Sequence, residues 1–273
     1  MEKLLDEIES YWSTRTEGYS EVNHKELAGT QKNAWLKVLT SQFPDKPKEE
    51  IRILDIGTGP GFFPVILAEA GYHVDAVDYT EGMLEKAKEN AGDLCRNIRF
   101  LRMDAQKLDF EDNTFDVVIS RNLTWNLEHP DVAYREWVRV LKVGGRLLNF
   151  DANWYGYLYE EEQRKAYEND RKNVENNSLD DHYLCTDIER MERIALQVPL
   201  SKISRPQWDV KTLREAGLLG IRTDTEIWKT VWSEEERLNY QSTPMFMVTG
   251  VKPDHFLNLP VVEGEKTEGC LEL

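Results

Sequence analysis

Residues 54–62 read Leu54-Asp55-Ile56-Gly57-Thr58-Gly59-Pro60-Gly61-Phe62. The apolar run before the glycines predicts a strand and the run after them predicts a helix, so the glycines occupy a strand-to-helix turn. Glycines at such a turn let the backbone approach a ligand closely, and the first amides of the helix offer unpaired donors to it. The segment therefore predicts a ligand site at the carboxyl end of a strand.

The spacing of the glycines bears on the kind of ligand. Gly57, Gly59 and Gly61 stand at alternate positions, whereas a dinucleotide-binding turn follows the pattern Gly-x-Gly-x-x-Gly. Asp55, placed before the turn, would repel a pyrophosphate and attract an ammonium group. The turn therefore favours a ligand with a positive charge, and a nicotinamide cofactor is the less favoured alternative.

Short β-branched strands alternate with amphipathic helices on both sides of this turn. Strands are expected at 51–56, 72–77, 98–102, 115–120 and 145–150, and helices at 62–70, at 80–90 with Thr80 as its cap, and at 131–141. This alternation predicts an α/β fold with a doubly wound parallel sheet and right-handed crossovers.

The flanking segments differ from this pattern. We expect an N-terminal helical cap at 1–45, a core at 46–152 and 207–253, a helical lid insertion at 153–206 and a tail at 254–273. Within the second part of the core, the sequence predicts a helix at 210–216 and strands at 220–228 and 245–251.

Acidic residues follow the next two strands of the predicted sheet. Asp78 ends the second strand, where a carboxylate can accept both hydroxyls of a ribose. Asp104 and Ala105 follow the third strand and are placed for the edge of an adenine. Tyr79 and Met83 offer apolar contacts beside the base. Together these positions indicate a nucleoside ligand, although strand-end aspartates also cap helices and Met83 also suits a core.

These motifs give the chain a family resemblance. The glycine turn, Asp78, Asp104-Ala105, the strand 115–120 and the segment 136–147 resemble class I S-adenosylmethionine-dependent methyltransferases of the type 11 or ubiquinone/menaquinone-methyltransferase-like group. The resemblance covers about residues 50–152. Val143 stands where the family commonly has Pro, in a turn that keeps both following glycines.

The resemblance implies a Rossmann-like seven-stranded sheet of order 3-2-1-4-5-7-6 with the last strand antiparallel, and it implies S-adenosyl-L-methionine as cofactor and S-adenosyl-L-homocysteine as product. Asp55 and the backbone of Gly57 and Gly59 would hold the methionyl group, beside Arg121 and Asn122. The expected cofactor-binding residues are Asp55, Gly57, Thr58, Gly59, Gly61, Asp78, Tyr79, Met83, Asp104, Ala105, Arg121, Asn122 and, from the cap, Tyr19.

Methyl transfer from a sulfonium needs alignment and exclusion of water more than a strong catalytic group. Where the acceptor must lose a proton, a base helps. Asp151, after the fifth strand, is the first candidate for that base, and His129 is the second, with the start of a helix as its alternative role. No residue is assigned to a metal, because His182 and Cys185 have a ligand-like spacing without a second such pair.

The insertion begins with aromatic residues, and the alternation of Tyr155, Tyr157 and Tyr159 suggests one shared face of an extended stretch or packing within a lid. Aromatic walls suit a flat apolar substrate or a cation held over ring faces, and they equally suit a packed lid core. The expected substrate-binding residues are Trp125, Asn153, Trp154, Tyr155 and His182.

The charge composition of the chain limits the classes of molecule that it is expected to bind. Lys and Arg number 34 against 50 Asp and Glu, a net charge of −16 that disfavours nucleic acid and anionic lipid. No apolar run reaches the roughly 18 residues of a membrane span, the first residues lack signal-peptide features, and the three cysteines lie far apart. These features are typical of a protein of the cytoplasm.

The sequence thus predicts a methyltransferase that modifies nitrogen, oxygen or carbon of a small molecule, with quinone-like aromatics and amines both open as acceptors. A non-catalytic module that binds the same cofactor is the alternative, and a nicotinamide-dependent oxidoreductase is less favoured. The acceptor and the oligomeric state are not determined by the sequence.

Overall fold

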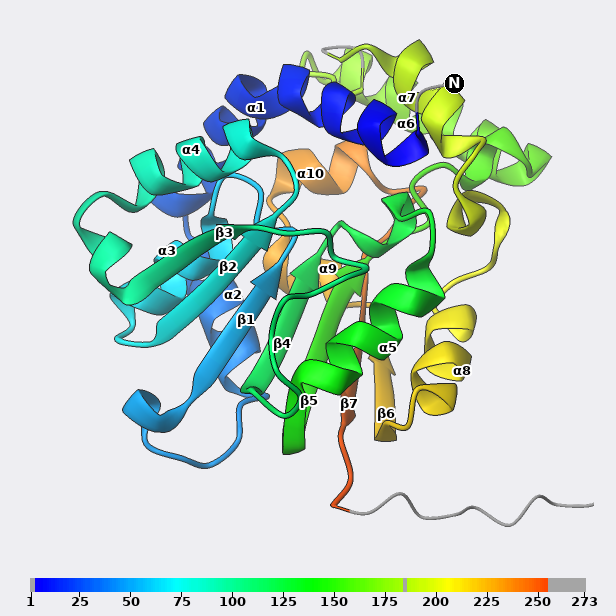
Figure 1. Cartoon of the computed structure of the whole chain (residues 1–273). Helices are drawn as coiled ribbons and strands as arrows, with labels where there is room; N and C mark the ends of the chain where they lie inside the picture. Colours follow the sequence, from blue (N-terminus) through cyan, green and yellow to red (C-terminus); the bar gives the residue numbers. More distant parts are fainter. Residues whose placement is uncertain (1–2, 184–185, 255–273) are drawn as a thin grey trace, which may run out of the picture.

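A computed structural model describes residues 3–183 and 186–254. Its centre is a seven-stranded sheet of order β3-β2-β1-β4-β5-β7-β6 (Figure 1). The strands are β1 (Arg52–Ile56), β2 (His73–Asp78), β3 (Ile98–Arg102), β4 (Phe115–Arg121), β5 (Leu141–Asp151), β6 (Leu219–Asp224) and β7 (Phe246–Val251). The first five strands pair in parallel, and β7 runs antiparallel to both β5 and β6. The predicted strand order and the antiparallel last strand are confirmed.

Helices cover both faces of the sheet. One face packs against α2 (Gln31–Thr40), α3 (Phe62–Glu69) and α9 (Trp228–Val231), around a core that includes Trp35 and Phe150. The other face packs against α5 (Pro130–Val140) and α8 (Gln207–Glu215), around Trp137 and Leu213. β1 and β4 lie between these layers and are buried on both sides, which explains their nearly continuous apolar sequence.

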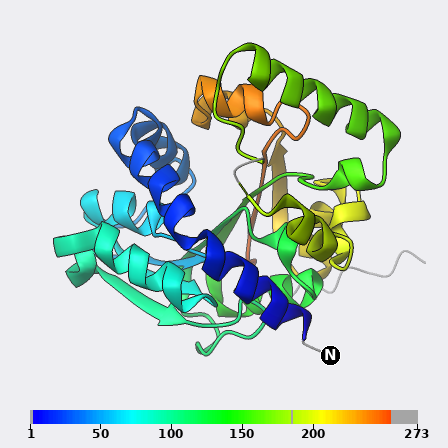
Figure 2. The same cartoon turned by 90° about the horizontal axis from the view of Figure 1, so that it is seen from above.

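A second group of helices lies above the carboxyl ends of the parallel strands (Figures 1 and 2). It consists of α1 (Leu4–Ala28), α6 (Glu161–Asn176), α7 (Ile188–Ala195) and α10 (Glu234–Asn239). α1 also contacts α4 (Glu81–Ala91). Short 3-10 turns η1–η5 lie at Lys48–Glu50, Gly92–Asn97, Thr124–Asn126, Gly156–Leu158 and Pro199–Lys202. Three separate stretches of the chain therefore meet over the edge where the glycine turn lies.

One predicted strand is wrong in its second half. The strand expected at 220–228 ends at Asp224, and Trp228 begins α9 instead. The apolar residues Ile227, Val231 and Trp232 follow helical spacing and pack into the core beside α2. α10 was not predicted either, although its capping box was readable: Ser233 accepts from the Glu236 amide and Glu236 accepts from the Ser233 amide.

Smaller differences have local causes. Thr80 occupies the N-cap position of α4, but its side chain makes no capping hydrogen bond; its amide donates to Asp78. Tyr155, Tyr157 and Tyr159 do not share the face of an extended segment: they flank and form a 3-10 turn, with Tyr159 exposed. Cys185, Cys270 and nearly all of the expected tail lie outside the described residues. Among the residues that the structure describes, no helix has the length and apolar character to cross a membrane.

Candidate functional site

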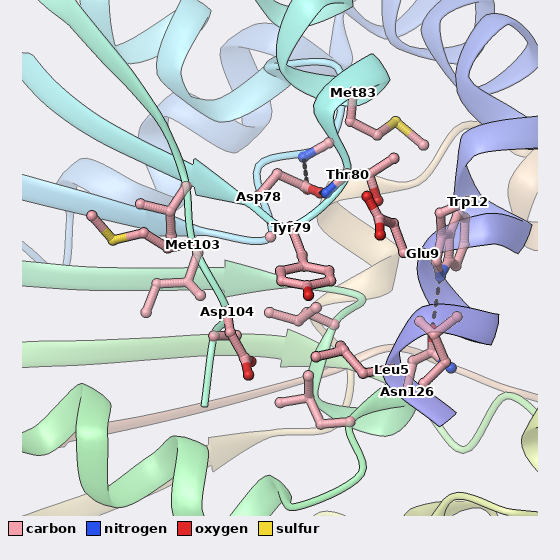
Figure 3. A pocket seen from close by; sticks show the side chains of 18 of the residues that line it. Leu5, Glu9, Trp12, Asp78, Tyr79, Thr80, Met83, Met103, Asp104 and Asn126 are labelled. Carbon is pink, nitrogen blue, oxygen red and sulfur yellow. Dashed lines mark hydrogen bonds between the residues drawn. The ribbon is translucent and has the colours of Figure 1, made fainter. Parts of the chain in front are cut away.

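A pocket lies under α1 at the carboxyl ends of β1, β2 and β4 (Figure 3). We call it the glycine-turn pocket. It brings together these residues predicted from the sequence: Gly57, Gly59, Asp78, Tyr79, Met83, Asp104, Ala105, Arg121, Asn122 and Tyr19. The strands place them there because the carboxyl ends of parallel neighbours meet at one edge of the sheet.

The backbone amides of the turn are already engaged within the fold. Gly57 N donates to Val77 O at 2.8 Å, and Gly59 N donates to Asp78 Oδ2, also at 2.8 Å. Both amides therefore have partners within the fold, and the role of the Gly57 and Gly59 backbone toward the methionyl group stays a prediction. The two amides hold the end of β1 against the end of β2, and the positive φ angles of Gly57 and Gly59 keep the turn compact enough for this.

The Asp78 carboxylate links two loops of the pocket. Its Oδ2 accepts from Gly59 N and its Oδ1 accepts from Thr80 N at 2.9 Å. Burial raises the pKa of Asp78 above its ordinary value, although the two amides oppose that shift. Each carboxylate oxygen has two lone pairs, so both retain capacity for a further donor from the pocket.

Asp104 lies across the pocket from Asp78 (Figure 3). Its Oδ1 accepts from the Gln106 amide at 2.8 Å and from Gln106 Nε2 at 3.1 Å, while Oδ2 takes no hydrogen bond from the described residues. The Ala105 carbonyl accepts from Trp137 Nε1 at 2.9 Å. The side of the pocket beside Met103 and Ala105 is thus apolar with one carboxylate oxygen at its edge.

Two residues of the glycine motif act behind the pocket wall. Asp55 is 2% exposed and does not line the pocket, and burial raises its pKa to about 7. At Gly61, φ is +91°, and a Cβ atom there would lie 3.0 Å from the Cβ of Ala87. Gly61 therefore lets α3 pack closely on α4 and does not contact the ligand space. Thr58 does not line the pocket either.

α1 forms the roof of the glycine-turn pocket. Trp12 Nε1 donates to Asn126 Oδ1 at 2.7 Å, as Figure 3 shows, and Glu9 pairs with Arg102 at 2.7 Å. The Tyr19 ring lies above the turn, 3.6 Å from the point where a Gly59 side chain would begin. Leu5 and Ile8 add apolar roof surface. Sequence patterns did not identify these α1 contacts, apart from Tyr19.

Arg121 and Asn122 mark the inner end of the pocket. The Arg121 guanidinium makes both of its terminal bonds to Glu26, at 2.7 and 3.0 Å, and lies over the rings of Trp35, Phe62 and Phe63. Asn122 has a φ of +56°. Its Oδ1 atom is buried and has no hydrogen-bond partner among the described residues.

A second pocket adjoins the first, and we call it the aromatic pocket. It shares Trp12, Tyr19 and Asn122 with the glycine-turn pocket. Four of the predicted substrate residues line it, namely Trp125, Trp154, Tyr155 and His182. Tyr11 of α1 also lines it, together with Tyr183 and Tyr240, which the sequence did not single out. Trp125 and Tyr155 stack with centroids 5.0 Å apart.

Asp151 is not placed to act as a base. It is fully buried, pairs with Arg205 at 2.7 Å, and accepts from the Trp125 amide, the Ala152 amide and Trp154 Nε1. Its oxygens are thus engaged in holding the β5 end together. Asp151 lines neither pocket.

Two further predicted residues point elsewhere. The His129 side chain is 62% exposed and lines neither pocket, and the residue is the N-cap of α5, which was its alternative role. Asn153 donates to the Arg205 carbonyl at 3.1 Å and lines neither pocket. Because neither side chain lines a pocket, the structure lends no support to the catalytic role of His129 or the substrate role of Asn153, and both stay predictions.

His182 has a different environment. Its Nδ1 lies 3.0 Å from the Tyr240 hydroxyl, and its Nε2 lies 2.9 Å from Glu235 Oε1. These contacts orient the ring at the boundary of the aromatic pocket. The other residue of the His182–Cys185 pair lies outside the described residues.

Comparison with known proteins agrees with this geometry. The model of a family described as "Methyltransferase domain" matches residues 54–149. Residues 54–149 are thus similar to a methyltransferase domain. The matched segment contains the glycine turn, Asp78, Asp104 and Asn122, which line the glycine-turn pocket. The α1 residues that line this pocket lie outside the matched segment.

Relatives of the methyltransferase domain include a demethylmenaquinone methyltransferase of Renibacterium salmoninarum, 31% identical over 148 residues, with 54% of this chain and 60% of the relative covered. A ubiquinone/menaquinone biosynthesis C-methyltransferase of Ectopseudomonas mendocina is 39% identical over 103 residues, with 36% of this chain and 40% of the relative covered. The chain thus spans about half the length of these curated relatives, and their acceptors are stated for them alone.

A solved structure also shares the fold. Phosphoethanolamine N-methyltransferase 2 of Haemonchus contortus, solved with S-adenosyl-L-methionine, superposes with a TM-score of 0.57 at 19% identity, over 81% of this chain and 52% of that chain. At this identity the likeness shows the fold alone.

The residues present fit the cofactor of the methyltransferase family. Asp78 retains acceptor capacity for ribose hydroxyls, and Asp104 Oδ2 is open at the apolar end for an exocyclic amine. At the opposite end the buried, unpartnered Asn122 Oδ1 offers an acceptor to an ammonium group. Acceptor groups thus stand at both ends and, at Asp78, between them, which matches the adenine amine, the ribose hydroxyls and the ammonium group of the cofactor.

Proposed function

We propose that this chain transfers a methyl group from S-adenosylmethionine to a small-molecule acceptor bound in the aromatic pocket. One observation carries the proposal: Trp12, Tyr19 and Asn122 belong to the walls of both pockets, so a ligand in each would meet at this boundary. When bound, S-adenosylmethionine supplies a methyl group on a positively charged sulfur, which is already activated for in-line displacement.

The protein contributes alignment and exclusion of water. Asp78, Asp104 and Asn122 would fix the cofactor at three points along the pocket. The α1 roof, held by the Trp12–Asn126 hydrogen bond and the Glu9–Arg102 ion pair, would keep water from the reacting atoms. Positioning of this kind can supply much of the rate, so the absence of Asp151 and His129 from the walls of the two pockets does not weigh against the reaction.

The net charge of −16 supports a small acceptor over a nucleic acid, since a phosphate backbone would be repelled. The enclosure of the aromatic pocket by α1 and the segment around Tyr155 and Tyr183 supports the same class of acceptor.

Calorimetric titration with S-adenosylmethionine, S-adenosylhomocysteine and NADH tests the cofactor part of the proposal. We expect micromolar binding of both sulfur nucleosides and none of NADH. The acceptor part is tested by release of S-adenosylhomocysteine in the presence of amines, phenols, quinols and thiols. Cofactor binding without turnover across this panel would favour the non-catalytic binding module instead, and binding of NADH alone would contradict both.

A further inference from the structure

A third cavity, of about 660 Å³, lies between α1, α10 and the carboxyl end of β4. We call it the acidic cavity. Carboxylates dominate its wall: Glu21, Glu26, Asp180, Asp181, Glu235 and Glu236 face three cations, Arg15, Lys25 and Arg121. It shares Tyr19, Asn122, Trp154 and Tyr240 with the aromatic pocket, so a molecule in one can extend into the other.

The wall of the acidic cavity has more carboxylates than cations, and Glu236 is one of the carboxylates that no ion pair neutralises among the described residues. Arg121 directs both terminal nitrogens to Glu26, at 2.7 and 3.0 Å. Glu236 Oε2 accepts only from neutral groups, Gln31 Nε2 at 2.6 Å and the Ser233 amide at 2.8 Å. No described lysine or arginine forms an ion pair with Glu236. Burial and the nearby Glu26 raise the pKa of Glu236, while the Ser233 hydrogen bonds and the charge of Arg121, which is paired with Glu26, oppose the shift.

The side-chain amide oxygens of Asn23 and Asn122 border the same cavity and accept no hydrogen bond from the described residues. Asn23 is 2% exposed, and its Nδ2 donates to the Tyr19 carbonyl at 3.3 Å, which fixes the direction of the amide. Asn23 Oδ1 then has no partner among the described residues, and neither has Asn122 Oδ1. A buried acceptor without a donor is costly, so a cavity bordered by two of them favours a ligand rich in N–H groups.

Aromatic faces complete the boundary. Tyr19, Trp154 and Tyr240 line both the acidic cavity and the aromatic pocket. Ring faces attract a cation within about 6 Å of their centroids, most strongly where water is excluded. The Glu236 carboxylate, the amide oxygens and the aromatic rings of this wall all favour a ligand that has a positive charge and hydrogen-bond donors.

We propose that the methyl acceptor carries a protonated primary or secondary amine, and that Glu236 with the Asn23 side-chain oxygen anchors this ammonium group in the acidic cavity, while Asn122 remains with the cofactor. The inference rests on the proposed function for the role of the bound molecule as acceptor. It concerns the group by which the acceptor is held and leaves the methylated atom open. A neutral quinone-like ring would satisfy neither the charge of Glu236 nor the Asn23 oxygen.

The test compares a cation with a neutral analogue of nearly the same shape. Phenethylammonium chloride and 2-phenylethanol are titrated into protein saturated with S-adenosylhomocysteine, at pH 7.5 and about 0.15 M salt to screen non-specific attraction. We expect the cation to bind at least about tenfold more tightly, as for hydrogen bonds to a charged group. Equal or tighter binding of the alcohol would overturn the inference, and so would absence of cation binding up to about 20 mM.

Glu236→Gln is the matching variant. It keeps the oxygen that accepts from Ser233, since glutamine also serves in a capping box, and removes the charge. We expect cation affinity to fall about five- to tenfold, with the affinity for 2-phenylethanol and S-adenosylhomocysteine within about twofold of the original protein. Glu17→Gln, which removes an exposed carboxylate of α1 outside the cavity, is the control and should leave cation affinity unchanged.

The outcomes separate this inference from the proposed function. If Glu236→Gln and Glu17→Gln behave alike, the ammonium anchor is wrong while the methyltransferase proposal stands. If S-adenosylhomocysteine does not bind at all, the proposed function fails, and the same comparison of cation and alcohol on the ligand-free protein still decides whether Glu236 binds an amine.

Discussion

At the scale of single residues, the carboxylates at the carboxyl edge of the sheet differ in what surrounds them. Asp78 lines the glycine-turn pocket, where its carboxylate can accept a hydrogen bond from a ligand. Asp55 is buried behind the wall of this pocket, and the oxygens of the buried Asp151 already accept hydrogen bonds from protein donors. All three follow or end a predicted strand, so their positions in the sequence are alike. Their functions differ because burial and hydrogen-bond partners differ.

Asp78→Ala is expected to weaken binding of S-adenosylhomocysteine by about 1.5–3 kcal/mol, because a charged acceptor would be lost from two hydroxyls. Calorimetry measures this loss. Asp109→Asn, an exposed acid in the loop after β3, serves as control and should bind as the original protein does. Unchanged affinity in Asp78→Ala would contradict the ribose assignment.

The buried Asp55 should make stability depend on pH. Its pKa is about 7 in the folded chain, above the ordinary 3.8, so the folded state binds the proton more tightly and loses stability as pH rises from about 4 through 7. Asp55→Asn carries no charge and escapes this loss. Its gain in free energy of unfolding over the original protein should therefore grow by about 2–3 kcal/mol between pH 5 and pH 8.

Urea denaturation of both proteins at the two pH values measures this difference, with Asp109→Asn as the control expected to show none. A gain that is constant or shrinks toward pH 8 would show that Asp55 is ionised at little cost in the folded chain.

At the scale of elements, close packing between helices explains part of the glycine motif. Gly61 and Gly71 have nearly the same backbone angle, φ of +91° and +90°, but a Cβ at Gly61 would meet Ala87 of α4 whereas one at Gly71 would meet nothing within 4 Å. The two positions therefore separate backbone strain from loss of packing.

Gly71→Ala should cost about 1–2 kcal/mol of unfolding free energy for the left-handed backbone alone. Gly61→Ala should cost about 2–4 kcal/mol, because α4 must also move away from α3. Chemical denaturation measures both, and equal losses would mean that α3 and α4 are not closely packed at this point.

The ends of β5 and α8 are joined by a buried charge network. Arg205 pairs with Asp151 at 2.7 Å and with Asp209 at 2.6 Å, and Tyr134 donates to Asp209. Arg205→Met would leave two buried carboxylates without a cation, and we expect a loss of about 3–5 kcal/mol. Arg214→Met, at an exposed position of α8, is the matched control and should change stability by less than about 0.5 kcal/mol.

Once an acceptor is known, the pH dependence of kcat tests whether Asp151 of this network acts as a base. Asp151→Asn should leave the pH profile of kcat in shape while lowering the unfolding midpoint. Disappearance of the acidic limb of the profile would restore Asp151 as the base.

At the scale of the whole molecule, the ligand space is roofed by segments distant in sequence. α1, the region of α6 and α7, and α10 meet over the sheet edge and contact one another through polar groups such as Arg190 with Ser10 and Arg171 with Asn239 (Figure 2). The roof also has a buried apolar cluster of its own, which includes Tyr11, Tyr183 and Ile194, so we expect it to open and close over the sheet edge as a unit.

Hydrogen exchange should show this. S-adenosylhomocysteine is expected to slow exchange in α1 and in residues 153–206, and to leave α8 unchanged as an internal control. Equal protection of both segments with and without the ligand would show that the roof is already closed in the free protein.

Sequence alone predicted the sheet and most of the strand-end residues that line the glycine-turn pocket. Strand order, the glycine turn, Asp78 and Asp104 are local in origin: hydrophobic period, glycine spacing and strand ends are short-range patterns. The start of α9 was missed because Ile227 and Val231 are equally suited to a strand, and packing against α2 decided between the two.

The acceptor side depended on tertiary structure. Asn23, Glu26 and Glu236 lie on α1 and α10, about two hundred residues apart, and nothing in either segment indicates that they border one cavity. Whether Asp151 is a base or a buried ion-pair partner was decided by Arg205, and whether His182 faces a ligand was decided by Tyr240 and Glu235. Short-range patterns determine backbone elements, whereas charge balance and burial arise only when distant segments pack together.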